Sequence, residues 1–373
     1  MTSNKTKWVR LGDYIEEVDE RNKEGFDYPF CGINKDKTFM PTVADTNNLD
    51  KTKYKLVTQG TFVFSGMQTG RDVCIRIALQ SEEEVVLISP AYTTFRVKRE
   101  LELRPLYLYM QFIRFEMDRY GWFLSDGSIR SNLDWDRFCD IRIPLPSMEV
   151  QRDLVATYEG LKRLAQDNEA LIAPLTEACQ AFIVNCKRQY PSVPLGDYIE
   201  EVDERNREKK YSVEDVRGMT ITKEVIPTKA DLKNSDLSNF KVVRPREFIY
   251  NPRTHGKKIG LGFNVTSKPF IISWNNIAFK VTAIDTLLPE YLFILFCRSE
   301  WDRNACFRSW GSSTEVFSWS ALCETIIPLP SLEVQQSIVN LYHCMEEAKS
   351  IAREARERLT TLCPALVQRG IDA

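Results

Sequence analysis

Apolar residues recur at alternating spacings of three and four positions through two long segments of the chain. The later series is Ile338, Leu341, Met345, Ala348, Ala352, Ala355, Leu359, Leu362 and Leu366. The earlier series lies 184 positions before it, is interrupted by the polar Thr157 and Asn168, and comprises Leu154, Thr157, Leu161, Leu164, Asn168, Leu171, Leu175, Ala178 and Phe182. Sustained 3-4 spacing produces a narrow apolar stripe that needs a second helix. We therefore predict two helices of roughly 30–35 residues, about 50 Å each, that pack on each other antiparallel. Pro174 and Pro364 are expected to kink or end them.

Shorter elements are predicted ahead of each helix. Runs of branched and aromatic residues predict strands over 61–65, 73–79 and 93–97. Helices are predicted over 105–120 and 132–140, and residues 11–22 are expected to be helical or turn-like. Glycine-bearing polar stretches separate these elements and predict loops. The pattern therefore indicates a mixed α/β (α+β) protein.

An internal repeat organises the chain. LGDYIEEVDERN occurs at 11–22 and again at 195–206, an offset of 195 − 11 = 184, and IPLPS at 143–147 returns at 327–331 with the same offset. We call 11–22 and 195–206 the frame segments. Such a repeat means that one unit was used twice. The predicted domains are 1–146 and 191–330, and the helices occupy 147–190 and 331–373. The repeated segments are alike in the two halves, but the sequence between them differs. This predicts two similar surfaces of different specificity.

Composition narrows the function classes. The chain has 373 residues, 43% hydrophobic and 27% charged, with a net charge of −2, which is ordinary for a soluble globular protein. Neither a membrane-length apolar run nor a secretory signal occurs, and ten scattered cysteines fit a reducing cytoplasm. No CxxC pair, Walker loop or methyltransferase cofactor loop is present. We therefore expect a cytoplasmic protein without catalytic residues, cofactor or metal.

The frame segments, the two Pro-Leu-Pro phrases, Ile88–Tyr92, Tyr250–Arg253 and the paired helices resemble the DNA-specificity subunit of Type I restriction–modification enzymes. The resemblance covers essentially the whole chain. It implies two pseudo-symmetric target-recognition domains, separated by two long antiparallel coiled-coil helices that set the gap between the half-sites of a bipartite, asymmetric double-stranded DNA target. It also implies docking of two methyltransferase subunits and a restriction (nuclease/translocase) subunit. According to this resemblance, catalysis is performed by those partners and not by this chain.

Candidate DNA contacts lie in polar loops of each half. Base reading needs hydrogen-bonding groups on exposed loops, and phosphate contacts position them. The best candidate is 238–270, which has seven cations, one acid and three glycines. The proposed DNA-binding residues are Gln68, Arg71, Tyr92, Arg130, Arg253, Thr254, His255, Lys257, Lys258 and Ser312. Each candidate also has an explanation without DNA. The basic stretch can be a solvated loop, the glycine-containing segments can be ordinary turns, and the aromatic residues can belong to the core.

The acidic frame segments are candidate docking surfaces, because they would repel phosphate. Their docking residues are Asp13, Glu16, Glu17, Asp197, Glu200 and Glu201; the helix stripe is represented by Leu161, Leu164, Leu171, Leu175, Met345, Leu359 and Leu362. Two other functions stay open. One is a two-module scaffold that binds proteins rather than DNA, and the other is a stand-alone modification enzyme.

Overall fold

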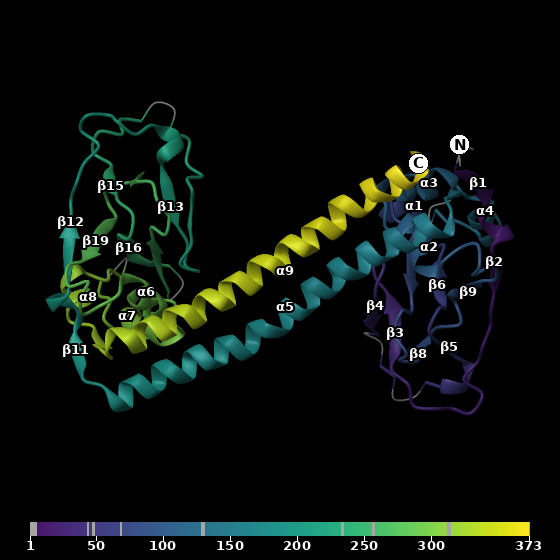
Figure 1. The fold of residues 1–373 in the computed structure, drawn as a ribbon, viewed down its shortest axis with the longest axis horizontal. Helices are drawn as coiled ribbons and strands as arrows, with labels where there is room; N and C mark the ends of the chain where they lie inside the picture. Colours follow the sequence, from purple (N-terminus) through teal and green to yellow (C-terminus); the bar gives the residue numbers. More distant parts are fainter. Residues whose placement is uncertain are drawn as a thin grey trace. The chain divides into compact units, whose positions relative to one another are not determined.

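The computed structural model describes residues 6–42, 45–46, 49–67, 69–127, 131–232, 235–255, 258–311 and 315–372. Of Gly70, Thr254, His255 and 362–372 only the backbone is described. The chain divides into two compact units, Met1–Asp167 with Ile351–Ala373 and Asn168–Ser350. Figure 1 shows the strands and short helices of each unit and the two long helices α5 and α9.

Two four-stranded sheets make up most of the first unit. One has the order β2-β9-β6-β7 and is antiparallel; the other has the order β4-β3-β8-β5, in which β3 and β8 are parallel. A short pair, β1 with β10, closes the unit. The strands are β1 (Lys7–Arg10), β2 (Ile15–Glu17), β3 (Phe30–Ile33), β4 (Phe39–Pro41), β5 (Lys55–Val57), β6 (Phe62–Ser65), β7 (Arg76–Leu79), β8 (Val86–Ile88), β9 (Thr93–Val97) and β10 (Arg142–Leu145). The helices are η1 (Leu11–Asp13), η2 (Lys51–Lys53), α1 (Thr69–Asp72), α2 (Pro105–Phe112), α3 (Phe115–Leu124), α4 (Trp135–Asp140) and α5 (Met148–Gln189).

The second unit repeats the main sheet with the order β12-β19-β16-β17. Its hairpin β13–β14 and the pair β15–β18 replace the second sheet, and β11 pairs with β20. The strands are β11 (Ser192–Pro194), β12 (Ile199–Val202), β13 (Arg217–Met219), β14 (Val225–Pro227), β15 (Lys241–Val243), β16 (Phe248–His255), β17 (Lys258–Phe263), β18 (Phe270–Ile272), β19 (Ile277–Val281) and β20 (Ile326–Pro328). The helices are η3 (Leu195–Asp197), η4 (Val213–Asp215), α6 (Pro289–Phe296), α7 (Ser299–Phe307), α8 (Trp319–Cys323) and α9 (Leu332–Asp372).

Each main sheet has a core of its own, and the two cores are built alike. Phe62 pairs with Phe95 across β6 and β9 and stacks on it at 4.8 Å, and Phe248 pairs with Phe279 in the same way at 4.9 Å. All four rings are buried. Alternate residues of a strand face opposite sides of its sheet, so the aromatic residues of these strands reach one apolar layer beneath the helices. The predicted fold class is confirmed: each half mixes strands with short helices, and the chain carries two long helices.

Each frame segment begins with a short 3₁₀ turn and continues into a short strand, not into a longer helix. Leu11–Asp13 forms a short 3₁₀ turn, and Ile15–Glu17 then pairs with β9. A Cβ on Gly12 would lie 2.9 Å from Cys139 Cβ, and one on Gly196 would lie 2.8 Å from Cys323 Cβ. The glycine of each LGD turn therefore allows the frame to approach α4 or α8 closely. Pairing with a strand far away in the sequence determines the extended conformation of Ile15–Glu17, and the local sequence pattern does not predict such pairing.

The predicted helix over 105–120 is two helices. Arg114 is extended, with φ −79° and ψ 136°, and separates α2 from α3. Arg298 is extended in the same way between α6 and α7. The apolar positions continue across the break because both helices pack on one core, so hydrophobic periodicity alone did not show where the first helix ends.

The long helices α5 and α9 each contribute half their length to each unit. The first unit takes α5 up to Asp167 and α9 from Ile351, and the second takes the remaining halves. The helices therefore run antiparallel (Figure 1). α5 continues through Pro174, which is exposed, so water can hydrogen-bond the carbonyl that the missing N–H leaves free. α9 likewise continues past Pro364. Each proline was expected to kink or end its helix, and the ending is wrong for both.

The buried stripe of α9 follows the predicted positions, with Met345, Ala348, Ala352 and Ala355 buried and Leu359 half-buried. The stripe of α5 differs from the predicted one. Leu161 and Leu175 are half-buried, but Leu164 and Leu171 are 45% and 50% exposed. Ala165 and Cys179 are buried in their place. Spacings of 3-4 and 4-3 give the same average period, so the packing partner decides which of two adjacent positions faces inward. The side chain of Leu362 lies outside the described residues.

Candidate nucleic-acid interface

Segments that are far apart in sequence meet at one end of each main sheet. In the first half the N–H of Leu133 donates to Gly66 O at 2.9 Å, and in the second the N–H of Phe317 donates to Pro252 O at 2.7 Å. Residues that flank the polar runs 125–130 and 309–314 therefore contact Gly66, which follows β6, and Pro252 in β16. We call each such pair of segments a loop pair.

The loop of each pair is closed at its base. Asp126 N–H donates to Asn132 O at 2.9 Å, and the Asn132 N–H donates back to the Asp126 carboxylate at 2.9 Å. In the second half Trp310 and Val316 exchange backbone hydrogen bonds of 3.2 and 2.9 Å. These positions correspond at an offset of 184. A shared backbone arrangement therefore holds side chains that differ between the halves.

Close approach of the two segments in the first loop pair requires glycine. A Cβ on Gly66 would lie 1.9 Å from Leu133 O, far inside van der Waals contact. The glycine thus allows the loop to lie directly on the end of β6. Tyr92 precedes β9, whose Thr93 pairs with Phe64 of β6, so it belongs to the same end of the sheet. It is half-buried and packs on a small apolar cluster.

The second loop pair carries an exposed cation and an exposed aromatic residue, both of which form β-bridges with Val316. Arg253 is exposed and forms a β-bridge with Val316, which in turn bridges Trp310. The Trp310 side chain is 80% exposed. An exposed guanidinium, which can pair with a base edge or a phosphate, and an exposed indole, which can stack on a base, are both typical of nucleic-acid surfaces. Lys258 is exposed at the start of β17, opposite His255 in the hairpin.

Four proposed DNA-binding residues lie outside the described residues, namely Gln68, Arg130, Lys257 and Ser312. Thr254 and His255 are placed by their backbones in β16. Arg71 is exposed on α1 and lies 3.2 Å from the Asp72 carboxylate.

The basic stretch 238–270 is less basic at its surface than its sequence indicates. Lys241 is buried, 3.4 Å from both Glu201 and Asp203. Arg244 is bound to Glu204 at 2.8 and 2.9 Å, and Arg246 to Glu290 at 2.9 Å. Within the described part of the chain, Arg253, Lys258 and Lys268 form no ion pair. The cations without an ion pair therefore lie on the β16–β17 hairpin, at Arg253 and Lys258, and in the connection between β17 and β18, at Lys268.

The frame segments use some of their acids internally. Asp19 and Asp203 each pair with a neighbouring arginine and a buried lysine. Hydrogen bonding from Arg21 lowers the pKa of Asp19. Burial opposes the same effect at Asp203, but hydrogen bonding from Arg205 still leaves its pKa below the ordinary value. Burial raises the pKa of Glu247, the one acid of the basic stretch, more than the backbone N–H of Arg244 lowers it.

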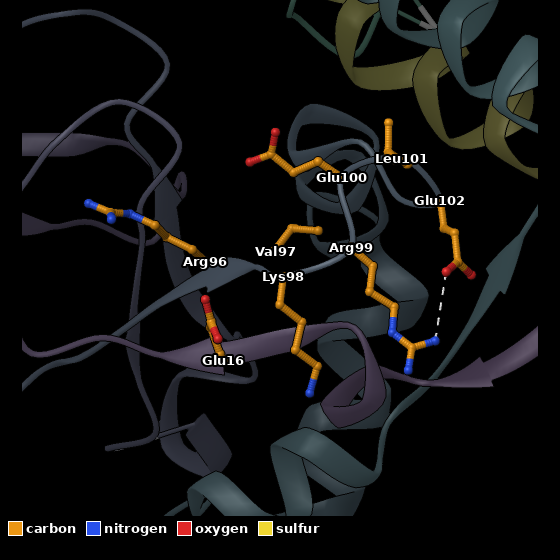
Figure 2. Close-up of a pocket in the computed structure, with 8 residues that line it drawn as sticks. All are labelled: Glu16, Arg96, Val97, Lys98, Arg99, Glu100, Leu101 and Glu102. Carbon is orange, nitrogen blue, oxygen red and sulfur yellow. Dashed lines mark ion pairs between the residues drawn. The ribbon is translucent and has the colours of Figure 1, made fainter.

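The proposed docking residues Asp13, Glu16, Glu17, Asp197, Glu200 and Glu201 are all exposed. Glu16 borders a shallow depression whose other lining residues run from Arg96 to Glu102 (Figure 2). Three acids and three bases line it, so it carries no net charge, and Leu101 beside it is 92% exposed. Mixed charge with an exposed leucine suits a protein partner better than phosphate.

Both halves contain a buried ion pair that our sequence reasoning missed. Lys37 Nζ donates to Asp118 at 2.6 Å and to Ile75 O at 2.7 Å, and Lys223 donates to Asp302 and Ile259 O at the same two distances. Each lysine has a positive φ at a hairpin tip, 62° and 69°. The pair fastens the hairpin β3–β4 or β13–β14 to the first turn of α3 or α7. The lysine and the aspartate both recur in the second half at offsets close to 184, and this recurrence could have indicated the pair from the sequence.

The described residues contain no group of three or more His, Cys, Asp or Glu side chains arranged to hold a metal ion. None of the described helices combines the length and apolar character needed to cross a bilayer.

Comparison with solved structures identifies proteins that have the same fold as this chain. No family model and no curated protein matches the sequence. The S subunit of the Type I restriction–modification system from M. genitalium superimposes with a TM-score of 0.60 at 12% identity, covering 99% of this chain and 97% of that one. The chain has the fold of a Type I S subunit. The HsdS subunit from Thermoanaerobacter tengcongensis (TM-score 0.43, 17% identity, 100% and 97% coverage) and a chain from a study of type I R-M complex assembly (0.41, 17%, 98% and 97%) also match.

Proposed function

We propose that this chain is the DNA-specificity subunit of a Type I restriction–modification complex. Residues 1–146 and 191–330 form its two target-recognition domains, and the helices of 147–190 and 331–373 set the gap between two half-sites. Each domain binds one half of a bipartite, asymmetric double-stranded target through its loop pair. The chain performs no catalysis itself and works in the cytoplasm, where the chromosome lies.

The observation that carries this proposal is the repetition of the loop pair with different side chains. In both halves one backbone hydrogen bond joins the two segments and another closes the loop. One presents Asp126 and Asn132 where the other presents Trp310 and Val316. Base edges are distinguished by side-chain chemistry, whereas the position of the domain on the duplex is set by its framework. Two like frameworks with unlike surfaces fit two different half-sites.

Partner docking is assigned to the exposed acids of the frame segments and to the outer face of α5. Leu164, Leu171 and Phe182 are each about half exposed on that helix. Exposed apolar side chains that recur along a helix favour packing by another helix. The expected partners are two methyltransferase subunits and the restriction subunit.

Spacer length tests the function directly. One heptad inserted in α5 after Asp167 and another in α9 after Ser350, where the two units divide, keeps the 3.5-residue period of the stripe. Seven residues lengthen a helix by about 10.5 Å, or about three base pairs of duplex. Sequencing the methylated positions in cells that express the complex should show a motif with a longer unspecified gap. A motif with the original gap contradicts the proposed role of the helices.

A protein scaffold is the second candidate, favoured by the internal neutralisation of Lys241, Arg244 and Arg246 and by the mixed-charge depression at Glu16. A gel shift with random duplex at low salt separates the two functions. A scaffold should leave the duplex unbound, whereas a specificity subunit should retard it and lose affinity steeply as salt rises.

A further inference from the structure

Three cations in the first half converge on one carboxylate. Lys35 from the β3–β4 turn, Arg71 from α1 and Arg76 from β7 lie 3.3, 3.2 and 2.5 Å from Asp72. The Asp72 side chain is only 4% exposed, but those of Lys35 and Arg71 are 60% and 62% exposed. Burial opposes ionisation of Asp72, yet hydrogen bonds from Arg76, Lys35 and Arg71 lower its pKa below the ordinary value. We call these four residues the Asp72 cluster.

The Asp72 cluster carries an excess of positive charge. Three cations face one anion, which leaves a charge of +2. The neighbouring pair Lys37–Asp118 is neutral and does not offset it. In the described part of the chain, no second carboxylate lies within ion-pair distance of Lys35 or Arg76. The ammonium group of Lys35 has three N–H donors, and one carboxylate leaves it with donors that can reach a further acceptor.

The carboxylate also restricts where the cations point. Long cationic side chains on a surface usually lose rotamer freedom when they bind an anion. Here Asp72 already draws Lys35 and Arg71 together from two different elements. An anion that meets the exposed sides of both cations therefore finds them partly ordered.

The second half lacks the cluster although it keeps the scaffold beneath it. The buried pair Lys223–Asp302 matches Lys37–Asp118. At the corresponding positions, however, Ile221 replaces Lys35 and Gly260 replaces Arg76. The arrangement of cations around a buried carboxylate is therefore a property of one domain and not a requirement of the fold.

We propose that the Asp72 cluster is a binding site for a backbone phosphate of duplex DNA. Lys35 and Arg71 make the contact, and Asp72 is a positioning residue that holds them with Arg76. The inference rests on the proposed function and changes the role expected for Arg71 from base reading to phosphate binding, because its guanidinium Nε is directed to Asp72. Guanidinium and ammonium groups together suit phosphate oxygens. The site is open and exposed, so a duplex that brings several phosphates suits it better than a single free anion.

The test is a salt titration of DNA binding by the full chain with a 30-base-pair duplex of arbitrary sequence. Lys35→Ala with Arg71→Ala removes up to two phosphate contacts, which should flatten the slope of log K against log salt by up to about 1.8. The matched control, Lys23→Ala with Lys53→Ala, removes the same charge from exposed positions of the same half that do not contact Asp72, and its slope should stay near wild type. Asp72→Asn adds positive charge, but should weaken binding because the cations lose their common anchor.

The outcomes separate the site from the function. If the wild-type chain binds duplex and the Lys35/Arg71 variant keeps the wild-type slope of log K against log salt, the phosphate site is overturned but the proposed function is not. An equal loss in the control variant also overturns it, because net charge then explains the effect. Tighter binding by Asp72→Asn removes the positioning role. Wild type that fails to bind duplex at any salt removes the proposed function and this site with it.

Discussion

Replacing Lys37 with methionine should destabilise the first unit strongly and leave the second unit unchanged. The lysine side chain is 5% exposed and that of its partner Asp118 is 14% exposed. Lys37→Met keeps most of the side-chain volume and removes the charge. Asp118 then retains the N–H of Ile75, at 2.9 Å, and a buried negative charge without its cation. The same reasoning applies to Lys223 and Asp302 in the second unit.

The magnitude follows from the burial of the pair. Removing one member of a buried ion pair costs about 3–5 kcal/mol, because the other charge stays desolvated. Adding Asp118→Asn removes that charge and keeps an acceptor for Ile75 N–H. Ile75 O still lacks its donor, so the double variant should lose about 1–2 kcal/mol. The two changes should therefore be coupled by at least about 2 kcal/mol. Lys37 also has a left-handed backbone conformation, which the ion pair helps to maintain.

Denaturant titration combined with hydrogen exchange resolves the effect by unit. Lys37→Met should lower protection in β3, β7 and α3, whereas Lys223→Met should lower it in β13, β17 and α7. The control is Lys53→Met, since Lys53 and Asp50 are 76% and 50% exposed and such pairs contribute about 0–1 kcal/mol. The reasoning is refuted if Lys37→Met costs under about 1 kcal/mol, or if the double variant is no more stable than the single one.

Two further predictions concern the helices and the second loop pair. A chain that ends at Tyr190 loses the second domain and α9 and exposes the buried side of α5, including Ala165, Cys179 and Ile183. It should therefore form symmetric dimers that recognise a palindromic bipartite site. Sedimentation as a strict monomer at micromolar concentration would contradict the helix pairing. Arg253→Ala should relax the choice at one base position, whereas Lys258→Ala should weaken binding to all sequences and flatten its salt dependence. Methylation sequencing and salt titration measure these effects, and wild-type behaviour of both variants would mean that the interface is misplaced.

The sequence by itself determined the organisation of this protein. The repeat offset of 184 predicted two like units, and branched residues predicted a strand over 93–97 that the structure has as β9. The 3-4 spacing predicted both long helices. These features depend on composition and local periodicity, which are present in the residues themselves. The candidate loops could also be found, because glycine and polar residues interrupt the apolar pattern there.

Only the tertiary structure decided how distant segments combine. It made strands of Ile15–Glu17, placed Ala165 rather than Leu164 in the helix contact, and paired Lys241 and Arg244 with acids of the second frame segment. It also joined Lys37 to Asp118 and gathered Lys35, Arg71 and Arg76 around Asp72. The physical reason is that the local sequence around a charged or apolar side chain does not show whether that side chain faces solvent or packs against a partner. Its partner lies tens of residues away, and only the packing of the sheets and helices brings the two together.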